Sequence, residues 1–195
     1  MHADRPTSEA TRSPGVRVVV VGETSSGAAA VTSDAIVEPT TLEVFPGSAF
    51  VRVWGSAEPP TLPSAGGRPP GPWIPPPGAV RFGVSVLPPA YGAGADELRA
   101  GLDEIRRQLP GLAESLDLDR PGKHRTDTVD LVFVAAGRVV LELDDGAEVA
   151  LAAGDCVVQV GARHAWRNRS DFPCTLVISM IGVPRDPDID RATLP

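Results

Sequence analysis

Two segments, HRTDTVD at His124–Asp130 and HAWRN at His164–Asn168, carry most of the information about the architecture. Side chains at alternate positions of an extended chain lie on the same face. Each segment therefore predicts a strand with its histidine and further polar residues on one face. The residues expected to point inward are His124, Thr126, Thr128, Asp130, His164, Trp166 and Asn168, and Arg163 and Arg167 are expected to point outward. An antiparallel barrel could bring the two faces together.

In the rest of the chain, the spacing of turn residues is typical of an all-β protein. Its 21 prolines and 20 glycines fall between short runs rich in β-branched residues, a pattern typical of strands joined by turns. Asp144-Asp145-Gly146 is a hairpin signal, because Asp and Gly tolerate positive φ. The predicted strands are Val16–Val21, Ala28–Thr32, Thr41–Phe45, Phe50–Trp54, Ala79–Leu87, Val129–Ala135, Arg138–Leu143, Ala147–Leu151, Cys156–Val160, His164–Asn168 and Thr175–Ile181.

Two segments between the strands differ from this pattern. Glu58–Gly78 is too rich in proline to pair in a sheet and is expected to cover the barrel wall, with Trp73 inside it. One amphipathic helix follows and stops at Pro110-Gly111, with a further turn expected at Leu112–Leu118. The helix is expected to pack on the sheet, with a lid over the barrel mouth as the alternative. Its apolar stripe consists of Leu98, Leu102, Ile105 and Leu109.

The paired segments resemble the two motifs of the cupin superfamily. The first motif of that family runs Gly, His-x-His, Glu and a later Gly, and here it corresponds to Gly122–Gly137. The second has a glycine, a short strand and His-x-x-x-Asn, and here it corresponds to Gly154–Asn168. The resemblance covers roughly Gly122–Ile181. It implies a double-stranded β-helix, the cupin or jelly-roll barrel, with the earlier strands completing the wall and one helix inserted.

The resemblance also implies a metal site, with two departures from the family pattern. Thr126 stands in place of the second histidine and Asp130 in place of the glutamate. Carried over by position, the metal ligands would be His124, Asp130 and His164. Such a set suits Fe(II), and Mn, Zn or Ni are open alternatives. Because Asp is shorter than Glu, Asp130 could instead orient a histidine or act as a general base. A barrel that lost its metal with the missing histidine is the remaining alternative.

Further residues are candidates for binding a substrate. Trp166 could either pack in the core or form part of the pocket wall. The side chain of Asn168 is expected to hydrogen-bond to the backbone near the turn before Asp171. Thr126 could hydrogen-bond a bound water. The other candidates for substrate contact are Gln159, Tyr91 and Arg81.

Fold resemblance restricts the reaction only loosely, because one fold hosts many activities. The leading hypothesis is a metal-dependent lyase, isomerase or cyclase acting on a small molecule. In it the metal stabilises an oxyanion, His164 is part of the catalytic site, and Asp130 or a metal-bound hydroxide moves the proton. The alternatives are an Fe(II) dioxygenase at the same residues and a barrel that binds a small ligand without catalysis. The resemblance further implies a homodimer.

Charge and hydropathy limit which partners and which cellular location the protein is expected to have. A net charge of −7 disfavours nucleic acid, which needs a basic face, and no apolar run reaches the length of about 20 residues that spans a membrane. The start of the chain lacks the pattern of a secretory signal, so a cytoplasmic protein is expected. Cys156 and Cys174 are expected to be buried, reduced thiols. The expected organisation is an arm at 1–15, one domain at 16–183 with its motifs at 121–183, and a tail at 184–195.

Overall fold

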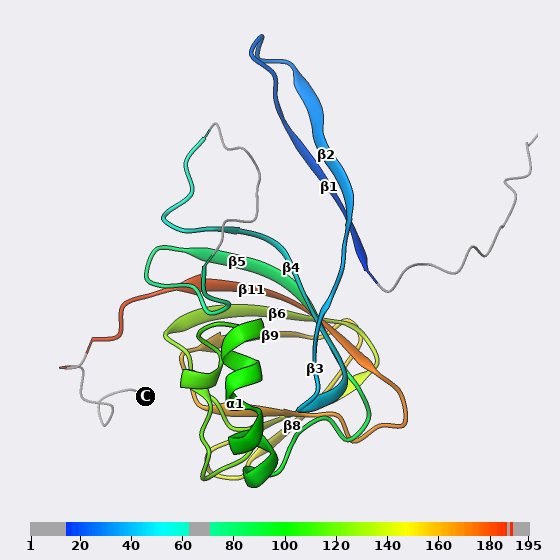
Figure 1. Cartoon of the computed structure of the whole chain (residues 1–195), viewed down its shortest axis with the longest axis vertical. Helices are drawn as coiled ribbons and strands as arrows, with labels where there is room; N and C mark the ends of the chain where they lie inside the picture. The colour runs from blue at the N-terminus through cyan, green and yellow to red at the C-terminus, as the bar shows by residue number, and fades with distance from the viewer. Residues whose placement is uncertain (1–14, 63–70, 187, 189–195) are drawn as a thin grey trace, which may run out of the picture.

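Alternating burial along the strands builds two sheets that face one another. The computed structural model describes residues 15–62, 71–186 and 188, and Figure 1 shows their arrangement. The elements, in chain order, are β1 (Val16–Glu23), β2 (Ala29–Val37), β3 (Thr40–Leu42), β4 (Phe45–Ser56), β5 (Val80–Leu87), α1 (Ala95–Gln108), the 3₁₀ turn η1 (Ala113–Ser115), β6 (Thr128–Ala136), β7 (Arg138–Leu143), β8 (Glu148–Ala152), β9 (Cys156–Val160), β10 (His164–Arg167) and β11 (Cys174–Gly182).

The larger sheet has six strands in the order β3-β4-β5-β11-β6-β9, and the smaller has three in the order β10-β7-β8. Because β6 and β7 are consecutive but lie in different sheets, the chain crosses between the two layers at Gly137. A core of buried side chains from both sheets, including Val134, Leu141 and Trp166, joins them. The predicted double-stranded β-helix with one inserted helix is confirmed.

The first two strands do not complete the barrel wall. β1 and β2 pair only with each other and form a ribbon that projects from the two sheets in Figure 1. An ion pair between Arg17 and Asp34, 2.6 Å long, crosses this ribbon. β2 continues through a polar stretch beyond the predicted end at Thr32 because it pairs with β1 as far as Val37. The strands that do complete the wall are β4 and β5.

The boundary between β3 and β4 also differs from the prediction. The predicted strand Thr41–Phe45 is divided, since β3 ends at Leu42 and Phe45 opens β4. β4 is longer than predicted because it pairs with β5 from Ala49 to Ser56. Long-range pairing, rather than the local side-chain pattern, sets these ends.

Helix α1 packs against the β3–β4 end of the larger sheet. The backbone N–H of Gly94 donates to Glu97 Oε2 at 2.8 Å and caps the first turn. Leu98 and Ile105, from the predicted stripe, are buried. Glu104 accepts hydrogen bonds from the backbone N–H groups of Glu43 and Val44, which fixes the helix to the β3–β4 turn. Within the described part of the chain, no helix has the length and hydropathy that crossing a membrane requires.

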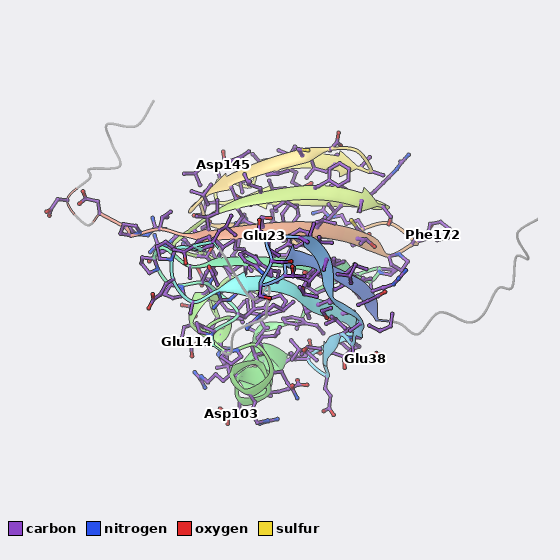
Figure 2. The ribbon with its side chains drawn as sticks, turned by 90° about the horizontal axis from the view of Figure 1, so that it is seen from above. Glu23, Glu38, Asp103, Glu114, Asp145 and Phe172 are labelled. Atoms are coloured by element: carbon purple, nitrogen blue, oxygen red, sulfur yellow. The ribbon has the colours of Figure 1, made fainter. Side chains whose placement is uncertain are left out.

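Figure 2 shows the same arrangement from above. Asp103 on α1 and Asp145 in the β7–β8 turn lie at opposite ends of this view, with the strands of the larger sheet between them. Helix α1 and the β7–β8 turn therefore lie on opposite sides of the larger sheet in this view.

The prediction for the cysteines holds for only one of them. Both are free and Cys174 is buried, but Cys156 is exposed. Cys156 opens β9, the edge strand of the larger sheet, and alternation places it on the outer face with Val158 and Val160, which are also exposed. An apolar sequence run does not distinguish the outer from the inner face of an edge strand.

Two turn glycines provide a matched test of the fold. Gly137 and Gly146 have φ of 78° and 82°, so alanine at either should cost about 1–2 kcal/mol in backbone strain. A Cβ at 137 would lie 2.5 Å from the Pro173 carbonyl oxygen, whereas one at 146 would meet nothing within 4 Å. We expect Gly137→Ala to lower the free energy of unfolding by at least about 3 kcal/mol, and Gly146→Ala by the backbone cost alone. Urea denaturation of both variants measures this, and equal losses would contradict the assigned crossover.

Candidate metal and substrate site

His124 and His164 lie side by side on adjacent extended segments. The backbone N–H of His124 donates to the His164 carbonyl at 2.9 Å, and that of His164 donates to the His124 carbonyl at 3.1 Å. Residues that exchange both bonds in an antiparallel pair stand opposite one another with their side chains on the same face. The two rings accordingly face each other, with centroids 4.2 Å apart and planes tilted by 57°. The convergence expected of these two histidines is present.

Each imidazole is held by a backbone carbonyl two residues before it. His124 Nδ1 lies 3.3 Å from the Gly122 carbonyl oxygen, and His164 Nδ1 lies 2.9 Å from that of Ala162. A carbonyl oxygen can only accept, so Nδ1 carries the proton in both rings. The neutral rings therefore keep an Nε2 lone pair available, which is the form that binds a metal ion.

The surroundings keep both rings neutral. Desolvation lowers the pKa of His124. For His164, desolvation first and the neighbouring His124 second lower the pKa to about 3. Burial has this effect because it disfavours the charged form of an imidazole. Neither ring is expected to be protonated near neutral pH.

The pair opens into a cavity of about 120 Å³ between the two sheets and the cover. Most of its wall is apolar and comes from β4, the Pro-rich segment, α1 and β11, whereas the polar groups come from β6, β9 and the two histidine segments. The residues that line it include Phe45, Phe50, Trp73, Ile74, Tyr91, Leu98, Leu116, His124, Thr126, Asp130, Gln159, His164, Trp166, Arg167 and Met180. Its size is close to that of the cavity of about 150 Å³ known to hold benzene.

Asp130 is a buried carboxyl group in this cavity. Its side chain is hydrogen-bonded to Thr128, yet Oδ1 has no hydrogen-bond partner among the described residues. Desolvation is the larger influence and raises the pKa of Asp130 to about 6. A carboxyl with that pKa can exchange a proton at near-neutral pH. Gln159, its partner across the β6–β9 pair, is buried too, and its Nε2 likewise has no partner.

Thr126, in the place of the family's second histidine, belongs to a hydroxyl pair. Its Oγ1 lies 2.7 Å from Thr128 Oγ1, and Thr128 in turn contacts the Asp130 carboxyl. The alternation predicted from the sequence is therefore correct from residue 124 to 130. It links the cavity wall to Asp130 through two hydroxyl groups.

Of the remaining candidates for substrate contact, two line the cavity and one lies outside it. Trp166 both lines the cavity and belongs to the core, with its ring edge-on to His164 at 5.8 Å. Tyr91 lines the cavity beside Phe45 at 5.4 Å, and burial raises the pKa of its hydroxyl. Arg81 is not brought to the cavity. Its guanidinium donates to the carbonyls of Ser56, Pro72 and Val80 and ties the cover to β5.

Two predicted orientations can also be compared with the structure. Asn168 is buried, and its side chain donates to the carbonyls of Leu87 and Phe172 and accepts from Ser170, as its expected backbone role requires. Arg167 was expected to point outward, but it lines the cavity and pairs with Glu142 at 2.9 Å. A partner on β7 holds its guanidinium there, which side-chain alternation alone could not indicate.

The donor set can be compared with the needs of a metal ion. Two neutral imidazoles suit the transition metals that prefer nitrogen ligands, and two metal–nitrogen bonds of about 2.0–2.1 Å can bridge rings this close. Among the described residues, however, no group of three or more His, Cys, Asp and Glu side chains is arranged to hold a metal. His124, Asp130 and His164 are thus not gathered into one three-ligand set. The site fits a metal held by the two histidines, with Asp130 standing apart.

Sequence reasoning missed most of the apolar wall. Phe45, Phe50 and Met180 line the cavity but carry no motif. Phe45 and Phe50 were placed only as strand residues. The alternation that placed Asp130 inward could have identified Met180, had the β6–β11 register been known, because the two residues are partners across that pair.

Comparison with known proteins finds a family resemblance in the second half of the chain. The family model described as the cupin domain matches residues 119–180. Phomopsin biosynthesis cluster protein C' of Diaporthe leptostromiformis is 46% identical over 67 residues, 32% of this chain and 35% of that protein. Oryzines biosynthesis cluster protein J of Aspergillus oryzae is 38% identical over 66 residues, 33% of this chain and 37% of that protein. The chain thus matches about a third of the length of these relatives.

Among solved structures, a sugar phosphate isomerase from a cupin superfamily of Silicibacter pomeroyi has a TM-score of 0.43 and 19% identity. The match covers 76% of this chain and 73% of that one. A predicted oxalate decarboxylase of Thermotoga maritima has a TM-score of 0.42 and 14% identity, over 75% and 94% of the two chains.

The raised pKa of Asp130 predicts a pH-dependent stability. The unfolded carboxyl ionises near its ordinary pKa of about 3.9, whereas the folded one ionises near 6. Stability is therefore lost as the pH rises through 6, by at most about 3 kcal/mol. We expect Asp130→Asn to raise the free energy of unfolding at pH 8 and to change it little at pH 4, as measured by denaturant titration. Asp171→Asn on the exposed surface is the control, and no gain for Asp130→Asn at pH 8 would contradict the assigned burial.

Proposed function

We propose that this chain, whose residues 119–180 match the cupin domain family, is a small-molecule enzyme that moves a proton on a largely apolar carbonyl compound. This is chemistry of the lyase, isomerase or cyclase kind. The observation that carries the proposal is the Asp130 carboxyl, whose Oδ1 has no hydrogen-bond partner among the described residues and whose pKa is raised to about 6, in the same cavity as two neutral imidazoles. Biosynthesis-cluster proteins among the relatives support a role in small-molecule metabolism.

The residues of the chain would divide the work. Phe50, Trp73 and Leu98 bind the apolar part of the substrate and exclude water. Asp130 takes a proton from the carbon next to the carbonyl group and later returns one, with Thr128 orienting its carboxyl. His124 and His164 would hold a divalent cation, which would supply positive charge in the cavity and favour the negative charge that develops on the substrate.

A non-catalytic ligand-binding barrel is a second candidate, and two observations favour it. Thr126 replaces a ligand of the family pattern, and the described residues hold no three-ligand group. Such a barrel would bind its ligand without proton exchange. The Fe(II) dioxygenase, which would require O2, has no observation that favours it over these two. The homodimer and the cytoplasmic location expected from the sequence stay predictions.

Metal content tests the role of the histidine pair. We expect the full chain purified without chelator to hold about one divalent ion per molecule, because both imidazoles line the cavity and carry their proton on Nδ1, which leaves Nε2 free. His124→Ala and His164→Ala should each lose most of that ion in elemental analysis. His2→Ala, the third histidine of the chain, is the matched control and should retain it. A wild-type protein without stoichiometric metal would favour the ligand-binding barrel.

Proton exchange tests the role of Asp130. We expect the wild-type protein to accelerate exchange of the α-protons of a small ketone such as cyclopentanone in D2O, followed by ¹H NMR. Asp130→Asn should lower that rate by about 10²–10⁴-fold, the usual contribution of a general base. Asp171→Asn should leave it unchanged. Exchange that persists in Asp130→Asn would reject this residue as the base.

A further inference from the structure

Asp130 and Gln159 present an unpaired hydrogen-bond acceptor and an unpaired donor beside each other in the cavity. They are direct partners across the antiparallel pair of β6 and β9, so their side chains leave the sheet on the same face, with Cβ atoms about 4.5–5.5 Å apart. The two residues are 8% and 5% exposed, and Asp130 Oδ1 and Gln159 Nε2 have no hydrogen-bond partner among the described residues. Unpaired buried polar atoms are rare and call for a specific explanation.

The neighbours of this pair do not complete its hydrogen bonds. Met180 lies opposite Asp130 on β11, and Val132 and Leu176 also line the cavity. Thr128 bonds the Asp130 carboxyl, yet no described group pairs with Asp130 Oδ1 or Gln159 Nε2. A bound molecule that offers a carbonyl oxygen to Gln159 would satisfy that donor, and its α C–H would lie beside the carboxylate that can take the proton.

We infer that Gln159 binds the carbonyl oxygen of an uncharged ketone or aldehyde whose α-carbon lies at Asp130. The inference rests on the proposed function and names its substrate class. Asp130 removes the α-proton, the C–H electron pair forms the carbon–carbon double bond of the enolate, and the carbonyl π electrons move to oxygen. The Gln159 N–H donates to that oxygen, where charge develops. Returning the proton from the Asp130 carboxyl to carbon completes the step without an oxidant or a reductant.

The charges around the cavity favour an uncharged substrate over a carboxylate. Arg167 lines the cavity, but its guanidinium already donates to Glu142 Oε2 and to the Pro121 carbonyl. Lys123 is likewise paired with Glu142, at 3.0 Å. A substrate carboxylate placed at Gln159 would lie beside the ionised Asp130, which would repel it.

The size of the cavity selects the probe. A volume of about 120 Å³ is suited to a molecule near the size of benzene, and cyclopentanone combines that size with one carbonyl and four α-protons. Methylenecyclopentane has nearly the same shape without the oxygen. The pair of compounds isolates the contribution of the carbonyl group.

The test is a titration of the full chain, with and without EDTA, against carbonyl-¹³C-labelled cyclopentanone. A hydrogen bond to the oxygen moves the carbonyl ¹³C resonance downfield, so we expect a saturable downfield shift in the wild-type protein that EDTA does not abolish. In Gln159→Met, whose side chain has similar size but no donor, the shift should vanish and the α-proton exchange rate should fall by about 10²–10³-fold. Gln159→Leu is the second variant if Gln159→Met fails to fold.

The remaining outcomes separate the inference from the proposed function. Asp130→Asn should lower the exchange rate by the factor given above but keep the ¹³C shift. A shift without exchange in the wild-type protein would reject the base while retaining Gln159 as the carbonyl donor. A shift that survives in Gln159→Met, or that is lost on adding EDTA, would overturn the inference in favour of another donor or the metal. Failure of the wild-type protein to bind cyclopentanone, or binding no tighter than methylenecyclopentane, would also overturn it.

Discussion

The reciprocal backbone hydrogen bonds between His124 and His164 are the constraint on which the site depends. Forty residues of chain separate the two histidines, and only the closure of the barrel allows their N–H and carbonyl groups to pair. Once paired, backbone geometry places both side chains on one face, and the carbonyls of Gly122 and Ala162 fix the ring protons. The position and the protonation of the pair therefore follow from main-chain bonds, which few side-chain changes elsewhere would disturb.

A single physical cause, removal from water, links the ionisable groups of the cavity. Desolvation lowers the pKa values of His124 and His164 and raises that of Asp130. The apolar wall from Phe45, Phe50 and neighbouring residues thus favours the uncharged form of each group. Desolvation of these groups lowers the stability of the fold. It also gives Asp130 a pKa close to neutral pH and keeps an unprotonated nitrogen on each imidazole.

Sequence patterns predicted the polar part of the site better than the apolar part. Alternation placed Thr126, Asp130 and Trp166 correctly because a strand has only two faces, and the motif spacing brought the histidines together. Arg81 could not be placed, because its role depends on carbonyls of a cover with no periodic pattern. The same holds for Arg167, which Glu142 on another strand draws to the cavity. The projecting ribbon of β1 and β2 was missed because strand propensity does not reveal which strand a segment will pair with.

The residues that line the cavity come from two parts of the chain, and this has an evolutionary consequence. Its hydrogen-bonding end comes from residues within the matched segment 119–180, whereas Phe45, Phe50, Trp73 and Leu98 come from outside it. Mutations in the N-terminal half can therefore reshape the compartment for a new molecule without altering the groups that would act on it. If the proposed function holds, homologues that share the later segment would keep its reaction while accepting different molecules, and such divergence should accumulate at Phe45, Phe50, Trp73 and Leu98.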